Sequence, residues 1–239
     1  MAIKMQLEKQ IAKRSKVHTI YKLKDGTKVP GVTTVLGVMN KPALMNWAWQ
    51  LGTQGIDYKH YVDATARIGT LAHEMIQEYL GGPEWDRSAF TREEIDTAEN
   101  AVLSFHEWER QTGHKMKTVA IEMPVVSEKY RYGGTVDWLG SIDASGGYWL
   151  VDFKTSKALY SEHEWQTSAY YKALLELGYK IKGVRLLRIG RFSDEGFDDH
   201  VLSKKQLESG WKVFLSALKL YQARYEYECG KKYGFKGAA

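Results

Sequence analysis

The most informative part of the chain consists of two short segments, Gly133-Gly-Thr-Val-Asp137 and Leu150-Val-Asp-Phe-Lys154, separated by a turn with two consecutive glycines. The apolar residues in both segments predict two strands joined by a reversal. If this hairpin is centred near Ser145, Asp137 lies opposite Asp152 or nearly so. The sequence therefore predicts two carboxylates side by side on one sheet.

Two opposed aspartates need a counter-charge. Directly opposed residues bring their Cβ atoms to about 4.5–5.5 Å, where like charges destabilise a sheet. A divalent cation converts this repulsion into coordination, because hard cations take carboxylate oxygens as ligands. Since side chains alternate along a strand, Asp152 and Lys154 point to the same face. The hairpin thus predicts two carboxylates and one ammonium on a small surface, an arrangement suited to phosphodiester hydrolysis.

Composition sets the outer bounds of the interpretation. A chain of 239 residues, 44% of them hydrophobic, suits one domain, with or without a helical embellishment. The formal net charge of +5 mildly favours a polyanionic partner. The single cysteine, Cys229, excludes an internal disulfide and a four-cysteine metal site. Because there is no apolar span or signal-peptide core, we expect a soluble, cytoplasmic protein of a bacterium or phage-infected cell without a membrane partner; an organellar origin stays open.

Periodicity and capping signals predict a mixed α/β chain. The helix signals include a capping box at Thr91-Arg-Glu-Glu94 and a second at Ser203-Lys-Lys-Gln206, and Ser161 is the predicted cap of a third helix. The expected elements are a hairpin at 18–29, helical pieces over 40–63, helices at 69–80, 91–113, 161–177 and 203–228, and strands at 119–126, 184–192 and 197–202.

The predicted helix 69–80 carries one histidine of interest. Its apolar stripe comprises Leu71, Ala72, Met75, Ile76, Tyr79 and Leu80, with His73 at the rim and Glu74 and Glu78 directed to water. A histidine at such a rim is more often a boundary residue than a ligand. However, the carboxylate pair lacks a third ligand, and neutral imidazole binds divalent transition metals. Both interpretations of His73 stay open at this point.

The predicted helix 161–177 places two polar residues in its apolar stripe. Gln166 and Tyr170 lie four residues apart, on the same side as Trp165, Ala169, Ala173, Leu174 and Leu177. A buried amide without a partner costs about 1–3 kcal/mol, so these groups need hydrogen bonds. One interpretation is a satisfied glutamine and a core tyrosine. The other is a pair that orients Lys154, a water or a phosphate.

Four segments taken together resemble a known family. In chain order they are Gly69-Thr-Leu-Ala-His73, Gly134-Thr-Val-Asp137, Asp152-Phe-Lys-Thr155 and Gln166-Thr-Ser-Ala-Tyr170. They resemble the motifs of the RecB-like branch of the PD-(D/E)XK nucleases, which includes stand-alone phage and mitochondrial exonucleases. The resemblance implies one restriction-endonuclease-like domain over 1–239, with a small mixed central β-sheet flanked by helices. Its parts would be a basic arm at 1–16, an N-terminal hairpin and helical region at 17–115, a catalytic sheet core at 116–202, a C-terminal helix at 203–229 and a tail at 230–239.

The resemblance also implies roles for the matched residues. His73, Asp137, Asp152 and the backbone carbonyl of Phe153 would bind Mg²⁺ or Mn²⁺. Lys154 would position or polarise the attacking water. The remaining matches are Gln166 and Tyr170, which would steady the active site and the DNA backbone, and two supporting residues, Glu122 and Thr155.

The activity implied is that of a metal-dependent DNA exonuclease acting on DNA with a free end. A structure-specific or restriction-like endonuclease and a non-catalytic DNA-binding relative are the alternatives. A helicase or recombination partner and the oligomeric state stay open.

Substrate contacts are less specific in the sequence. Basic residues that could follow a phosphate backbone are Arg67, Lys157, Arg185, Arg188 and Arg191, although each alone is typical of a solvated surface. The aromatic residues Trp47, Trp49, Tyr58 and Tyr61 could stack unpaired bases or belong to the core. We expect His106 and His163 to be solvated helix positions.

Overall fold

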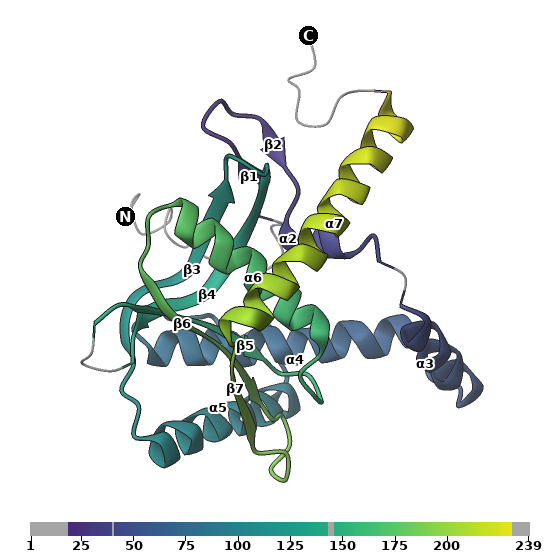
Figure 1. Cartoon of the computed structure of the whole chain (residues 1–239). Coiled ribbons are helices and arrows are strands. Elements are labelled where there is room, and N and C mark those ends of the chain that lie inside the picture. The colour runs from purple at the N-terminus through teal and green to yellow at the C-terminus, as the bar shows by residue number, and fades with distance from the viewer. Residues whose placement is uncertain (1–18, 40, 143–145, 231–239) are drawn as a thin grey trace, which may run out of the picture.

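Five strands form one mixed sheet in the order β3-β4-β5-β6-β7 (Figure 1). The computed structural model describes residues 19–39, 41–142 and 146–230. Strands β5 and β6 run parallel, and every other neighbouring pair of this sheet is antiparallel. The strands span Lys117–Ser127 (β3), Tyr132–Ser141 (β4), Tyr148–Lys154 (β5), Ile181–Ile189 (β6) and Phe197–Val201 (β7). This architecture confirms the predicted mixed α/β fold.

Helices cover both faces of the sheet and bury two apolar clusters. On one face, α2 (Val32–Leu36), α6 (Ser161–Glu176) and α7 (Lys204–Cys229) pack over β4, β5 and β6. On the other, α4 (Tyr58–Tyr79) and α5 (Arg92–Thr112) pack over the same strands. Helix α3 (Pro42–Thr53) projects away from the sheet (Figure 1), and Leu51 is its only buried residue.

The predicted helix caps at Thr91 and Ser203 are confirmed. The Glu94 N–H donates to the Thr91 hydroxyl at 3.2 Å, and the Thr91 N–H donates to the Glu94 carboxylate at 2.8 Å. Ser203 and Gln206 form the same reciprocal pair at the start of α7. At the third helix the prediction is wrong, because the residue preceding α6 is Tyr160, whose N–H donates to Nδ1 of His163.

The prediction that a helix begins at Gly69 is wrong. Helix α4 starts eleven residues earlier, where the Asp57 carboxylate accepts a hydrogen bond from the His60 N–H at 2.8 Å. Gly69 lies inside this helix for a different reason. A Cβ there would come within 2.7 Å of the Thr155 hydroxyl, so the glycine lets α4 pass close to the end of β5.

For three residues, the predicted exposure to solvent is also wrong. Glu74 is only 7% exposed, because α4 packs against α5 and shares a buried apolar cluster with the sheet. Tyr79 is 55% exposed, since it ends the helix and packs edge-on against the partly exposed His106. Leu177 is 49% exposed because it follows the last residue of α6.

Two glycines of the predicted motif allow aromatic rings to lie on β4. A Cβ at Gly133 would come within 2.3 Å of the Tyr21 ring, and one at Gly134 within 2.3 Å of the Tyr170 ring. Tyr21 belongs to the predicted N-terminal hairpin, confirmed as β1 (Tyr21–Lys22) and β2 (Lys28–Val29). The glycines thus bring this hairpin and α6 against the strand that carries Asp137.

Candidate active site

The sheet register brings three carboxylates into one row. The register of β4 and β5, which pairs Trp138 with Val151, places Asp137 opposite Asp152 one residue further on. The register of β3 and β4 places Glu122 opposite Asp137 in the same way. The predicted juxtaposition of Asp137 and Asp152 is therefore confirmed, and a third acid extends it.

The buried Asp152 forms an ion pair with the partly buried Lys154. Asp152 is 1% exposed, and its Oδ2 lies 2.5 Å from the Lys154 Nζ. Apart from this contact, neither carboxylate oxygen of Asp152 has a hydrogen-bond partner among the described residues. Burial raises the pKa of Asp152 to about 6, against the opposing influence of the Lys154 charge. The lysine is thus the main counter-charge of this carboxylate.

Asp137 is held by the backbone of the neighbouring strand. Its Oδ2 accepts a hydrogen bond from the Phe153 N–H at 2.9 Å. Burial raises the pKa of Asp137, while Lys154 and the Phe153 N–H act in the opposite direction. This hydrogen bond fixes the carboxylate beside the Asp152-Phe-Lys154 segment.

Helix α4 brings His73 to the same place. Its Nδ1 lies 3.8 Å from Oδ2 of Asp137, and its ring packs edge-on against Phe153 at a centroid separation of 6.2 Å. Burial, and secondly the Lys154 charge, lower the pKa of His73 to about 4. The imidazole is therefore neutral near pH 7, which is the form that binds metal.

Gln166 and Tyr170 of α6 form a hydrogen bond with each other. The Gln166 Nε2 donates to the Tyr170 hydroxyl oxygen at 2.8 Å. Burial, followed by the Asp152 charge, raises the pKa of Tyr170. The tyrosine ring lies against Gly134, so this pair packs directly behind the strand that carries Asp137.

The donor groups suit a divalent cation. Among the residues that the structure describes, no three His, Cys, Asp or Glu side chains enclose a point at ligand distances. The chemistry of the set nevertheless fits, because Asp152 has buried oxygens without hydrogen bonds, Asp137 faces it and His73 is neutral. These three side chains would hold the ion.

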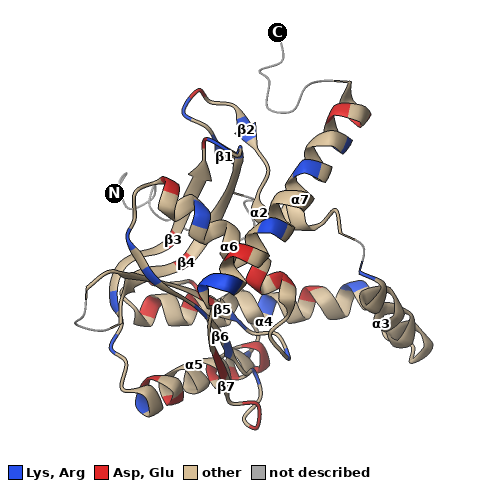
Figure 2. Cartoon of the chain, viewed as in Figure 1, with Lys and Arg blue, Asp and Glu red and all other residues tan. Residues whose placement is uncertain are grey.

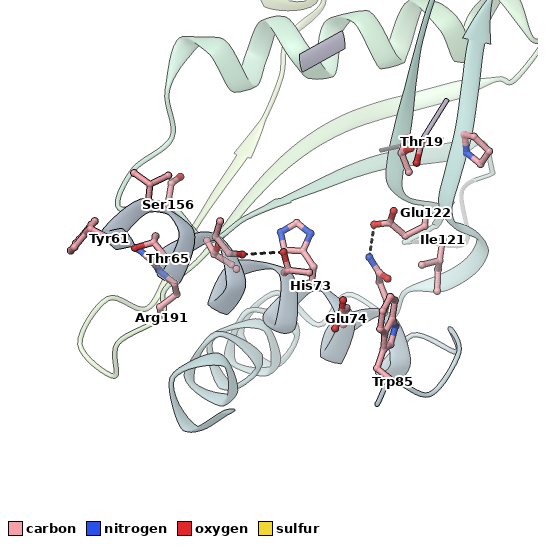
Figure 3. Close-up of a pocket in the computed structure, with 18 of the residues that line it drawn as sticks. Thr19, Tyr61, Thr65, His73, Glu74, Trp85, Ile121, Glu122, Ser156 and Arg191 are labelled. Carbon is pink, nitrogen blue, oxygen red and sulfur yellow. Dashed lines mark hydrogen bonds between the residues drawn. The ribbon is translucent and has the colours of Figure 1, made fainter. Parts of the chain in front are cut away.

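The site opens into a large cleft. Its volume is about 1390 Å³, and its walls come from α3, α4, β3 and the residues that follow β5 and β6. His73, Glu122 and Thr155 line it directly, and Figure 3 shows His73 coming from a helix and Glu122 from a strand. This volume exceeds the roughly 300–1,000 Å³ that is typical of small-molecule pockets.

Sequence reasoning missed two polar residues of α4. The Gln77 Nε2 donates to the Glu122 carboxylate at 2.6 Å, and both residues line the cleft. Glu74 lines it as well, and burial together with the Glu122 charge raises its pKa to about 7. The spacing of His73 and Gln77, four residues apart on one helix, was the available signal.

Two of the arginines proposed for a phosphate track are structural. Arg185 and Arg188 are each 5% exposed and are paired with Asp199 and Asp198. Arg185 also lies between the rings of Trp108 and Trp149, a packing role that strand periodicity alone did not reveal.

Arg67 lies on the side of α4 that faces α5. Its guanidinium contacts Glu94, the Ala89 carbonyl and the Phe90 ring. Among the described residues that line the cleft, neither Arg67 nor Lys157 occurs. Figure 2 shows both signs of charge interspersed along α4, α5 and α7, so net charge does not single out one face.

The aromatic candidates divide into two groups. Trp47 lines the cleft and packs edge-on against Tyr58 and Tyr61, at centroid separations of 5.4 and 5.7 Å. Trp49 is 67% exposed and does not line it.

The prediction that His163 is solvated is wrong. Its Nδ1 accepts the Tyr160 N–H, and burial lowers its pKa to about 4. His106, likewise, is only partly exposed and stacks edge-on against Tyr79.

Comparison with known proteins establishes the family. The model of the PD-(D/E)XK nuclease superfamily matches residues 47–216, and the chain belongs to that superfamily. The superfamily that the four motifs indicated is thereby confirmed. No helix among the described residues combines the length and apolarity of a membrane span.

Solved structures similar to the chain include two exonucleases by name. A candidate exonuclease from Eubacterium rectale has a TM-score of 0.48 at 10% identity, over 69% of each chain. An alkaline exonuclease from Laribacter hongkongensis has a TM-score of 0.37 at 13% identity, over 93% of this chain and 98% of that one. No curated protein matches the sequence.

Proposed function

We propose that this chain is a divalent-metal-dependent DNA exonuclease. The observation that carries the proposal is the pair of Asp137 and the buried Asp152, opposed across two strands. Lys154 contacts Asp152, and the Nδ1 of the neutral His73 lies 3.8 Å from Asp137. Nucleases of this superfamily generally use divalent metals. Mg²⁺ or Mn²⁺ fits the oxygen-rich donor set, and the single imidazole favours Mn²⁺ without excluding Mg²⁺.

The metal, when bound, supplies an activated water and neutralises charge on the phosphate oxygens. Asp137, Asp152, His73 and the Phe153 carbonyl would hold it. The carboxylates are positioned before any ligand arrives, because the Phe153 N–H fixes Asp137 and burial confines Asp152. Such preorganisation is the main contribution that a protein makes to this chemistry.

Lys154 would act as a charged hydrogen-bond donor. Asp152 and Asp137 raise its pKa against the effect of burial, so the ammonium persists at neutral pH. A fixed ammonium within contact of a metal-binding carboxylate can orient the attacking water and meet charge that develops on the phosphate. Gln166 and Tyr170 support the strand from behind, and Thr155 and Glu122 lie on the cleft wall.

The test is digestion of 5′- and 3′-labelled single- and double-stranded oligonucleotides, and of linear and closed circular DNA, with Mg²⁺, Mn²⁺ or chelator. We expect metal-dependent release of terminal nucleotides from linear DNA and no cutting of the circle. Asp152→Asn should be inactive, whereas Asp96→Asn, an exposed aspartate on α5, should behave as wild type. Cutting of closed circles would favour the endonuclease alternative. Complete inactivity with both metals would indicate a non-catalytic relative.

A further inference from the structure

One arginine in the cleft wall is buried without a counter-charge. Arg191 is 8% exposed, and among the described residues its side chain forms no hydrogen bond, ion pair or ring contact. Its Nε is fully buried and unsatisfied. Burying a charge without a partner is costly, so such a group is normally paired or binds an anion.

The local carboxylate, Glu195, forms no ion pair with the Arg191 guanidinium within 4 Å. Glu195 uses its Oε2 to accept the backbone N–H groups of Arg191 and Phe192, at 2.8 and 3.4 Å. By contrast, Arg185 and Arg188 on β6 are similarly buried, and each has its own aspartate. The turn after β6 therefore holds the backbone of Arg191 firmly while leaving its guanidinium free.

The topology places this guanidinium beside the active site. Strands β5 and β6 are parallel, so the residues that follow them, Ser156 and Arg191, lie at the same edge of the sheet. Both line the cleft that also contains His73. Figure 3 shows Arg191 on the same wall as Ser156 and Thr65, next to Tyr61.

We propose that Arg191 binds a phosphate of the substrate strand other than the one being cut. A guanidinium offers five donors in a planar fork that matches phosphate oxygens. Trp47 and Tyr61 on the neighbouring wall present rings to the same cleft, where a base attached to that phosphate could stack. This inference rests on the proposed nuclease function, since it assumes a nucleic-acid strand in the cleft.

The test measures binding without cutting. Fluorescence anisotropy of a labelled single-stranded oligonucleotide, in chelator and over a range of salt, compares wild type with Arg191→Gln, Arg191→Lys and a control. The control is Arg224→Gln, an exposed arginine paired with Glu228 on α7. We expect Arg191→Gln to weaken binding about 10- to 100-fold and to reduce the salt slope by about 1. Arg191→Lys should bind with intermediate affinity, because lysine keeps the positive charge but lacks the planar fork of guanidinium donors.

Substrates with and without terminal phosphates identify the source of the phosphate. If Arg191 holds a terminal phosphate, removing that phosphate should abolish the difference between wild type and Arg191→Gln. If it holds an internal one, the difference persists. Both results support the proposal.

A structural role for Arg191 predicts a different outcome. Because the free guanidinium is unpaired, Arg191→Met should raise the unfolding temperature of the ligand-free protein, whereas a structural arginine would lower it. The proposal would be overturned if Arg191→Gln kept the affinity and salt slope of the wild type. It would also be overturned if Arg224→Gln lost as much affinity as Arg191→Gln, or if the wild type did not bind the oligonucleotide. Binding that depends on Arg191 without any metal-dependent cleavage would instead contradict only the nuclease function.

Discussion

At the scale of single residues, the site depends on charges that are buried together. Asp152 has Lys154 as its main counter-charge, and Asp137 lies next to both. A buried carboxylate that loses its partner is destabilised far more than an exposed one. The ammonium therefore has two separable roles, one in the stability of the free protein and one in the reaction.

Replacing Lys154 with Met separates these roles. We expect cleavage to be abolished while metal binding is largely retained, because the lysine is not a ligand. We also expect the free energy of unfolding to fall by about 2–4 kcal/mol at pH 8 in chelator. Adding Mn²⁺ should restore much of this stability, since the ion replaces the lost positive charge. Calorimetric titration and urea unfolding measure the two effects; a loss of metal binding equal to that of Asp152→Ala would contradict the assigned role.

Glu74 predicts an unusual dependence of stability on pH. Its pKa is about 7 in the folded protein against 4.5 for the free side chain, so the folded state retains a proton that the unfolded state has lost between these values. Its contribution to stability is therefore full below pH 4.5, falls as the pH rises to about 7, and stays lost above it. Glu74→Gln should remove this loss, stabilising the metal-free protein by about 1–3 kcal/mol at pH 8.

At pH 5 the gain from Glu74→Gln should be much smaller. Urea unfolding at pH 5 and pH 8 measures the difference in the free energy of unfolding between the wild type and Glu74→Gln. Glu78→Gln, on the same helix with an Arg87 partner, is the matched control and should give no gain at either pH. Equal gains for Glu74→Gln at pH 5 and pH 8 would contradict the assigned cause.

At the scale of elements, glycines determine how closely helices approach the active-site strands. A Cβ at Gly134 would lie 2.3 Å from the Tyr170 ring, which is buried and cannot move aside. Gly134→Ala should therefore destabilise the protein by about 1–3 kcal/mol and displace Gln166 and Tyr170. Gly52→Ala in α3 is the control, because nothing lies within 4 Å of its Cβ, and it should be neutral or slightly stabilising. Thermal unfolding compares the two, and equal effects would show that the close approach is unimportant.

Gly69 offers a second test of the same idea. Gly69→Ala should impair activity and stability, because its Cβ would come within 2.7 Å of the Thr155 hydroxyl. Thr155→Ala removes that oxygen, so the double substitution should recover stability relative to Gly69→Ala alone. Strict additivity of the two changes would contradict this contact.

The sequence predicted the elements better than their environments. Capping boxes at Thr91 and Ser203 and the hairpin register near Asp137 are local signals, and all three are confirmed. The burial of Glu74 was missed, because it depends on two neighbours, α5 and the sheet, that a single-helix projection does not contain. The start of α4 was misplaced because Gly69 meets a tertiary packing requirement and was interpreted as a local one.

At the scale of the whole molecule, the sheet gathers residues from distant segments at one edge. Asp137 and Asp152 come from adjacent strands, His73 from α4, and Arg191 from the turn after β6. Only the first two could be placed together from the sequence, because hairpin register is local. The proximity of His73 was supported by family motifs. The lack of a partner for the Arg191 side chain could not be predicted, because it depends on how the turn after β6 folds and on Glu195 binding the backbone instead.

The central claim is that Asp137, Asp152 and His73 bind one divalent cation beside Lys154. Calorimetric titration of Mn²⁺ into the wild-type protein, Asp152→Asn, His73→Ala and Asp96→Asn tests it most directly. We expect a saturable site in the wild type and in Asp96→Asn, at least tenfold weaker binding in His73→Ala and none in Asp152→Asn. Unchanged Mn²⁺ affinity in Asp152→Asn would contradict it.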